Sequence, residues 1–99
     1  MIRLEGDRML VSGALTLSEV AAALAQGNAA IADGARCVDL AQVRELDSSA
    51  LALLLAWLRE ARRRGRDLSL ANLPEGLTTI ARLYGVADLL PASPAPAHH

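Results

Sequence analysis

Residues 36–58 place the strongest limit on the fold, because an apolar strand pattern there passes directly into a long helix pattern. Residues 37–43 are mostly apolar, with Asp39 as the one charged residue, which is typical of a strand in the middle of a parallel sheet covered by helices. The segment 47–49, Asp-Ser-Ser, follows. Asp and Ser are favoured at helix N-termini because they accept hydrogen bonds from unpaired backbone N–H groups. The Leu/Ala-rich run after this segment predicts a helix, and the whole stretch predicts an α/β domain.

Shorter patterns on both sides of this stretch complete a small α/β arrangement. The sequence predicts a hairpin within 2–11, a helix at 17–32, a strand near 68–70 and a helix that starts at Pro74 and stops at Gly85. This order predicts one mixed sheet of about four strands, parallel in its middle, with three to four helices packed against it. The tail at 91–99, PASPAPAHH, is Pro/Ala-rich and has no periodicity, so we predict that it is disordered.

The helix at 17–32 is predicted from a capping pattern and an apolar face. Thr16 with Glu19 three residues later fits a capping box. One apolar face follows at helical spacing, formed by Leu17, Val20, Leu24 and Ile31. Gly27 weakens the middle of the pattern, since glycine is a poor helix former.

The central helix carries two apolar stripes. The first stripe has the spacing of a core-facing side and comprises Leu51, Leu54, Leu55 and Leu58. The second stripe lies further round the helix and comprises Ala50, Leu53 and Trp57. Either the sheet curls over the second stripe, or the stripe is an exposed patch that a partner covers. We expect the exposed patch, with Leu53 and Trp57 as the apolar anchor of an interface.

Two groups of polar side chains are candidates for function. Ser48 and Ser49 are expected to be exposed where a strand passes into a helix, a place suited to an anion, a phosphate or the polar groups of a partner. Asp39 is unusual in an apolar strand. Its carboxylate is either satisfied by neighbouring backbone N–H groups or lies near the serine pair, at the carboxyl edge of the sheet where ligands gather.

The composition argues against several classes of function. The chain has no Lys, its two His lie in the tail, and Cys37 in an apolar strand is interpreted as a buried structural thiol. There is no metal-ligand pattern, no phosphate-binding glycine loop and no good base for a serine nucleophile, so we predict no catalytic residue, no metal and no cofactor. A net charge of −1 gives no electrostatic case for nucleic acid, and the arginines at 59–66 are expected to complement the helix dipole. The longest apolar run, 50–58, is too short to span a membrane.

The sequence resembles the STAS domains, small α/β modules named for sulfate transporters and anti-sigma-factor antagonists. The resemblance rests on Asp39-Leu40 followed by Asp47-Ser48-Ser49-Ala50-Leu51. The segment LANLPEGLTTIARLYGVADLL at 70–90 is most similar to the MlaB-type branch of this family, the short STAS subunits of the Mla phospholipid ABC transport system. The resemblance covers residues 8–90 and implies a STAS fold for a domain at 1–90.

Membership of that branch would imply a non-catalytic subunit that binds and supports the ATPase of the transporter. The complex also contains a membrane permease and moves phospholipid, which maintains outer-membrane lipid asymmetry. The subunit would be cytoplasmic and peripheral to the inner membrane through its partner, with no membrane insertion and no nucleic acid. The resemblance and the apolar stripe together predict a partner surface of Asp47, Ser48, Ser49, Ala50, Leu53 and Trp57. MlaB-type proteins carry Thr where this chain has Ser48, and both residues provide a hydroxyl.

A second function is implied by another branch of the family. Its anti-sigma-factor antagonists are phosphorylated by a partner kinase on the serine that corresponds to Ser49, which adds charge at a helix N-terminus. Those proteins typically carry Gly after the serine pair, whereas this chain has Ala50. The segment at 70–90 also favours the transporter branch.

Overall fold

The computed structural model describes residues 1–90, and the predicted disorder of the tail at 91–99 lies outside the described residues. The elements in chain order are β1 (Ile2–Glu5), β2 (Arg8–Leu15), α1 (Val20–Ala32), β3 (Cys37–Leu46), α2 (Ser48–Arg63), β4 (Ser69–Ala71), α3 (Glu75–Leu83) and the short 3-10 helix η1 (Ala87–Leu89). This order agrees with the predicted succession of strands and helices.

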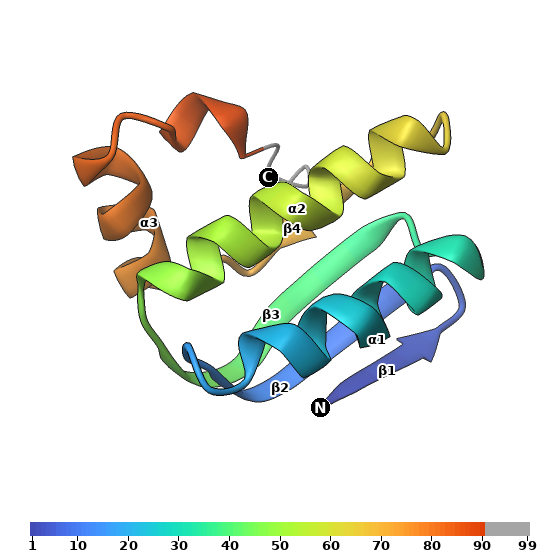
Figure 1. The fold of residues 1–99 in the computed structure, drawn as a ribbon, viewed down its shortest axis with the longest axis horizontal. Coiled ribbons are helices and arrows are strands. Elements are labelled where there is room, and N and C mark those ends of the chain that lie inside the picture. Colours follow the sequence, from blue (N-terminus) through green and yellow to red (C-terminus); the bar gives the residue numbers. More distant parts are fainter. Residues whose placement is uncertain (91–99) are drawn as a thin grey trace, which may run out of the picture.

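The four strands form one mixed sheet in the order β1-β2-β3-β4 (Figure 1). The pair β1–β2 is antiparallel, and the pairs β2–β3 and β3–β4 are parallel. The helices α1 and α2 lie side by side across one face of the sheet, and α3 lies beyond the end where β3 passes into α2 (Figure 1). The predicted fold class, a mixed sheet of about four strands with three to four helices packed against it, is confirmed.

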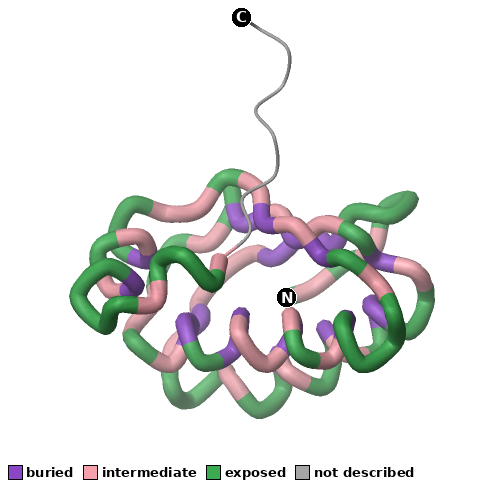
Figure 2. Tube along the Cα trace, turned by 90° about the horizontal axis from the view of Figure 1, so that it is seen from above, coloured by how far each residue is buried: buried purple, intermediate pink, exposed green. Residues whose placement is uncertain are grey.

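The core lies between the sheet and the helices. Alternate residues of each strand point toward the helices, and Figure 2 shows buried positions recurring along both kinds of element. The largest fully buried side chains are Trp57, Met9, Ile31, Leu40, Leu53, Leu54, Leu70, Leu77, Val11 and Val38. Because the chain has no Phe and one Trp, aliphatic side chains that interdigitate between the layers supply most of the buried surface.

The helix α1 begins later than predicted, at Val20. Glu19 occupies its N-cap position without a side-chain hydrogen bond, so the capping box predicted for Thr16 and Glu19 does not form. The preceding residues make a turn in which the Glu19 backbone N–H donates to the Thr16 carbonyl oxygen over 2.8 Å. Leu17 therefore lies outside the helix and is 76% exposed, rather than on the apolar face of α1.

The strand β3 continues to Leu46, further than predicted. Its second half pairs with the end of β2, with Leu15 opposite Leu46, after two irregularities in the register. Irregularities of this kind bend and twist a strand pair. Only Asp47 separates β3 from α2, so the end of the sheet determines where α2 begins.

The helices α1 and α2 approach each other closely at Gly27. A Cβ atom added to Gly27 would overlap the indole ring of Trp57. The indole Nε1–H also donates to the Leu24 carbonyl oxygen over 3.4 Å. The glycine in the middle of α1 is thus explained by the ring that packs against it. The helix α1 therefore covers the Trp57 end of the second apolar stripe of α2.

The C-terminal part of the described chain packs on the core through a few side chains of α3 and of the residues after it. Leu77 of α3 is buried, whereas Tyr84 follows the end of the helix and is exposed. After α3, Val86 and Leu90 pack against the core, and Leu89 between them is exposed. The segment after α3 therefore packs on the core through Val86 and Leu90.

Candidate functional site

The N-terminus of α2 is built on the carboxylate of Asp47. Its Oδ1 accepts a hydrogen bond from the backbone N–H of Ser49 over 2.8 Å, the arrangement of a helix N-cap. The backbone of Asp47 is extended, with φ of −134°, so the chain leaves the strand and enters the helix at this residue. The helix start predicted at the Asp-Ser-Ser segment is confirmed.

The other oxygen of the same carboxylate reaches the turn that precedes α1. The Oδ2 atom of Asp47 accepts a hydrogen bond from the backbone N–H of Leu17 over 3.1 Å. Asp47 thus joins two segments that are 30 residues apart in the sequence. This contact brings the exposed Leu17 to the start of α2, next to the serine pair.

These hydrogen bonds also fix the charge of Asp47. Donation from the N–H of Ser49, and next from the N–H of Leu17, holds the pKa of the Asp47 carboxyl below its ordinary value. The positive end of the α2 dipole favours the same ionised form. Asp47 is therefore a carboxylate at neutral pH, and its charge is used to hold the two backbone segments together.

Ser48 is exposed and Ser49 is half-buried in the first turn of α2. The Asp47 carboxylate beside these hydroxyls already accepts hydrogen bonds from the backbone N–H groups of Ser49 and Leu17. We call Leu17, Asp47, Ser48 and Ser49 the serine surface. It combines an exposed aliphatic side chain with two hydroxyl groups and a carboxylate, which suits a partner that offers an apolar contact and hydrogen-bonding groups.

Three of the predicted partner-binding residues belong to the core instead. Ala50 and Trp57 are 0% exposed, and Leu53 is 2% exposed. The indole ring of Trp57 packs on α1 at Gly27. The prediction that Leu53 and Trp57 form an exposed apolar anchor is wrong, because α1 lies over this side of α2.

Leu17 is a residue of the serine surface that the sequence pattern places on the apolar face of a helix instead. The error came from choosing Thr16 as the helix cap. Ser18 is as good a cap as Thr16, and a helix that starts after Ser18 leaves Leu17 outside it. Two alternative cap residues, Thr16 and Ser18, therefore indicate that the sequence alone does not determine whether Leu17 lies inside the helix.

Asp39 lies in the first half of β3, away from the serine surface. Asp47 is eight positions further along the chain, a distance of about 25 Å along an extended strand. Its carboxylate accepts hydrogen bonds from the Ala41 N–H over 3.0 Å, from Asn72 Nδ2 over 2.9 Å and from Arg8 Nη1 over 2.8 Å. Burial raises the pKa of Asp39, but the bonds from Asn72, Ala41 and Arg8 together lower it below its ordinary value. Of the two interpretations, the structural one is supported.

Within residues 1–90, no group of three or more His, Cys, Asp or Glu side chains is placed to hold a metal ion. Over the same residues, no helix is both long enough and apolar enough to cross a membrane. Cys37, predicted to be a buried thiol, is half-buried because it is the first residue of β3.

Residues 2–91 match the family described as Mlab, STAS domain. Two relatives are each 33% identical to this chain over 87 residues, and both are the intermembrane phospholipid transport system binding protein MlaB, one from Escherichia coli strain K12 and one from Shigella flexneri. Each alignment covers 87% of this chain and 89% of the relative. The similarity therefore spans most of both proteins.

Solved structures with the same arrangement of elements include the anti-sigma factor antagonist SpoIIAA. Its unphosphorylated form has a TM-score of 0.69 at 16% identity and covers 96% of this chain and 88% of that one. The phosphorylated form of the Bacillus protein has a TM-score of 0.66 at 16% identity, with coverage of 96% and 91%. At this identity the likeness concerns the fold alone, and it confirms the STAS fold implied by the sequence. With the family match and the MlaB relatives, it follows that the chain belongs to the MlaB-type STAS domain family.

Proposed function

We propose that this protein is a non-catalytic subunit of an Mla-type ABC transporter for phospholipid, and that it binds the ATPase of that transporter. The proposal is supported by the relatives named MlaB, which are binding proteins of an intermembrane phospholipid transport system. The protein acts by contact, and the ATPase performs the chemistry. It is cytoplasmic and reaches the inner membrane through the ATPase and the permease of the same complex, where it supports lipid asymmetry of the outer membrane.

The serine surface is the part of the molecule that we assign to the ATPase. The observation that carries this choice is the pair of hydrogen bonds to Asp47, from the N–H of Leu17 and from the N–H of Ser49. They hold an exposed aliphatic side chain and the first turn of a helix in one place. Interfaces need an apolar anchor surrounded by polar groups, and Leu17 provides the anchor that the buried Trp57 cannot.

A negative charge at position 49 is expected to affect partner binding without affecting folding. In the free domain, Ser49→Asp is tolerated, because a carboxylate suits a helix N-terminus. In the complex, the same carboxylate lies in the interface without a partner, and a desolvated unpaired charge costs several kcal/mol. The substitution is therefore expected to abolish association and to leave the fold intact.

The test is co-purification of the protein with the ATPase of its own transporter. The variants are Ser49→Asp and Leu17→Ser, and Leu83→Ser is the matched control, since Leu17 is 76% exposed and Leu83 is 77% exposed. We expect wild type and Leu83→Ser to retain the ATPase, and Ser49→Asp and Leu17→Ser to lose it. Circular dichroism of each free domain checks that the fold is unchanged.

Two results would contradict different parts of the proposal. If wild type fails to retain the ATPase, the transporter assignment is wrong. If Ser49→Asp and Leu17→Ser both co-purify normally, the partner binds another surface of the domain.

A phosphorylation switch at Ser49 is the second candidate function. It is supported by the likeness in fold to SpoIIAA, for which phosphorylated and unphosphorylated forms are known, and by the place of Ser49 at the positive end of α2. The identity to the MlaB proteins favours the transporter subunit over this alternative. Mass spectrometry of the protein isolated from its native cells tests the switch, which requires phosphate on Ser49.

A further inference from the structure

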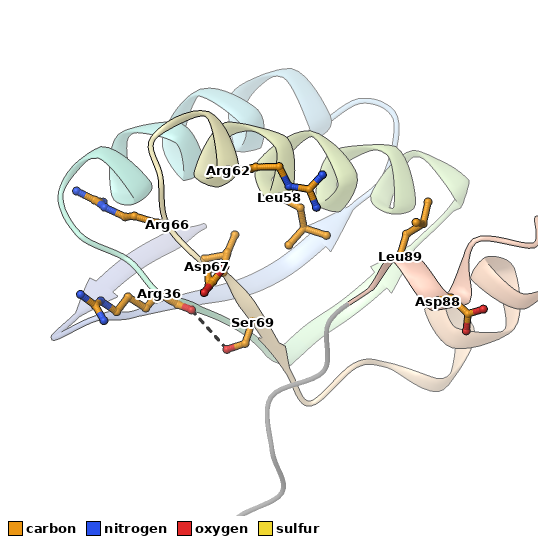
Figure 3. A pocket seen from close by; sticks show the side chains of 9 residues that line it. Arg36, Leu58, Arg62, Arg66, Asp67, Ser69, Asp88 and Leu89 are labelled. Carbon is orange, nitrogen blue, oxygen red and sulfur yellow. Dashed lines mark hydrogen bonds between the residues drawn. The ribbon is translucent and has the colours of Figure 1, made fainter.

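The sheet has two edge strands, β1 and β4, and they differ in how open they are. The strand β4 has only three residues. A hollow of about 520 Å³ lies beside its first residues, and charges of both signs line it, among them Arg36, Arg66 and Asp67 (Figure 3). The strand β1 has four residues and forms the opposite edge (Figure 1). Among the described residues, no strand pairs with its outer side, so β1 is the edge that a further strand can join.

The outer side of β1 carries backbone groups that face away from the sheet. Beside this strand, the Met1 amino group donates to the Ser12 carbonyl oxygen over 2.7 Å, and the Ser12 N–H donates to the Met1 carbonyl oxygen over 2.9 Å. Hydrogen-bonded and non-hydrogen-bonded pairs alternate along an antiparallel ladder, so the backbone groups of Ile2 and Leu4 point away from β2. Within residues 1–90, no other strand pairs with them. A row of such N–H and C=O groups is a template for pairing with another chain.

The charges on β1 are complementary to those of a second copy of the same strand. Arg3 and Glu5 are exposed on one face of β1, where Arg3 Nε lies 2.9 Å from Glu5 Oε2. If two copies of β1 run antiparallel with Leu4 opposite Leu4, Arg3 of each copy lies opposite Glu5 of the other. These opposed residues form non-hydrogen-bonded pairs, in which side chains approach most closely. The strand therefore offers two ion pairs to its own copy.

The same charges exclude the neighbouring registers. Because only alternate residues have outward backbone groups, the register can change only in steps that keep those residues paired. A step in one direction places Arg3 opposite Arg3, and a step in the other places Glu5 opposite Glu5. Like charges directly opposite each other destabilise a strand pair. Charges on an edge strand usually prevent pairing, whereas here they permit one register with one partner.

The helix α1 lies next to this edge of the sheet and suits the approach of a second copy. It contains no charged residue. Ala22 and Gln26 line a small hollow together with Ile2, which places this flank of α1 beside β1. The exposed positions of α1 are Ala21, Ala22, Ala25, Gln26, Ala29 and Ala32. Small uncharged side chains let two copies of α1 come together over the joined strands without the cost of burying a charge.

We propose that a second copy of this protein binds along β1, antiparallel and with Leu4 opposite Leu4. The two Leu4 residues exchange two backbone hydrogen bonds, and Arg3 pairs with Glu5 on each side of them. The two sheets then form one continuous sheet, and the contact has the two-fold symmetry that is commonest in homo-oligomers. An interface built on one short strand and one helix is small, so the dimer is weak and reversible.

The test is sedimentation equilibrium of the full chain at concentrations from micromolar to millimolar. We expect the average mass to rise with concentration from the 10.4 kDa of one chain toward twice that value. Glu5→Arg places like charges opposite each other and is expected to weaken the dimer at least about tenfold. Exchanging the two charges, with Arg3→Glu and Glu5→Arg together, is expected to restore it. The matched control is Glu45→Arg, which makes the same change of charge at an exposed residue of β3 and is expected to dimerise as wild type.

Hydrogen exchange of the wild-type protein tests the register directly. The Leu4 amide faces outward in the single chain and is hydrogen-bonded in the dimer, so its exchange is expected to slow as the concentration rises. The amides of Arg3 and Glu5 face β2, so their exchange is expected to depend much less on concentration. This readout does not depend on whether a substituted chain folds, which circular dichroism checks for each variant.

Four results would overturn the proposal. They are a mass of one chain at every concentration, a dimer that Glu5→Arg leaves unchanged, failure of the charge exchange to restore the dimer in a folded chain, and exchange of the Leu4 amide that is independent of concentration. Equal weakening by Glu45→Arg and Glu5→Arg would also contradict it, because net charge and not β1 would then control association. All these measurements use the protein alone, so they are independent of association with an ATPase.

Discussion

Two regions of α2 compete in the sequence as the surface for a partner: the apolar stripe that ends at Trp57 and the first turn at Ser48. The structure separates them, since Trp57 is fully buried against α1 and Ser48 is exposed. Apolar side chains are removed from water by whatever element of the same chain can reach them. The polar turn has no such tendency and stays at the surface. A second apolar stripe on a helix is therefore covered by another helix of the same chain where one can reach it, and by another protein only where none can.

The largest expected effect is that of Trp57→Ala on stability. Because the ring is enclosed between α1 and α2, truncation leaves a cavity and is expected to cost about 3–5 kcal/mol of unfolding free energy. Urea unfolding of wild type and variant measures this cost. Near-normal stability together with lost ATPase binding would restore Trp57 as an interface residue.

Gly27→Ala tests the same contact from the side of α1. The added methyl overlaps the indole of Trp57, so overpacking is expected to destabilise the fold by about 1–3 kcal/mol. Gly76→Ala in α3 is the matched control, because its nearest neighbour, Leu46 Cδ1, lies at 3.8 Å, an ordinary contact. That variant is expected to be neutral or to stabilise the fold by up to about 1 kcal/mol. Equal effects of the two substitutions on the unfolding free energy in chemical denaturation would mean that helix propensity, and not overlap with the indole, determines the change in stability.

Asp47 tests the polar region, where a smaller effect is expected. Asp47→Ala removes the cap of α2 and should lower the Tm by about 5 °C. Asp47→Asn keeps one acceptor oxygen, which suffices for the N–H of Ser49 or of Leu17 but not for both. We therefore expect Asp47→Asn to nearly retain the Tm and to speed hydrogen exchange at the Leu17 amide. An unchanged exchange rate at that amide would show that the turn is held by other contacts.

The smallest effect is expected in acid. The hydrogen bonds from Ser49 and Leu17 lower the pKa of Asp47 in the folded state relative to the unfolded state. The stability that this group contributes is present above its unfolded pKa of about 4 and is lost as the pH falls through the lower folded value. The difference in Tm between wild type and Asp47→Ala should therefore be constant near neutrality and shrink below about pH 4. A difference that grows in acid would contradict the assignment.

The fold could be predicted from the sequence because the patterns that specify it are local. The run from Cys37 through the serine pair fixes a strand, a cap and a helix within a few residues of one another. The contact between Trp57 and Gly27 joins residues 30 positions apart, and no periodicity in either helix encodes it. A glycine inside a helix pattern was the one local trace of that contact, since it marks a close approach of another group.

Part of the candidate site could be predicted from the sequence for a similar reason. Asp47 and the serine pair were recognised because capping chemistry is written in adjacent residues. Leu17 was not, because its place depends on which of several polar residues starts α1 and on a bond to Asp47 across the fold. Cooperation between distant segments of the chain, and not composition, completes this surface.

The passage from β3 to α2 through a single residue bears on how fast a complex forms. With only Asp47 between strand and helix, there is no flexible linker whose conformational entropy must be lost when a partner arrives. The unbound and bound shapes of this surface are then nearly the same, and association is limited by collision and orientation rather than by rearrangement. Substitutions at Leu17 or Ser49 should accordingly shorten the lifetime of the complex and leave its rate of formation almost unchanged.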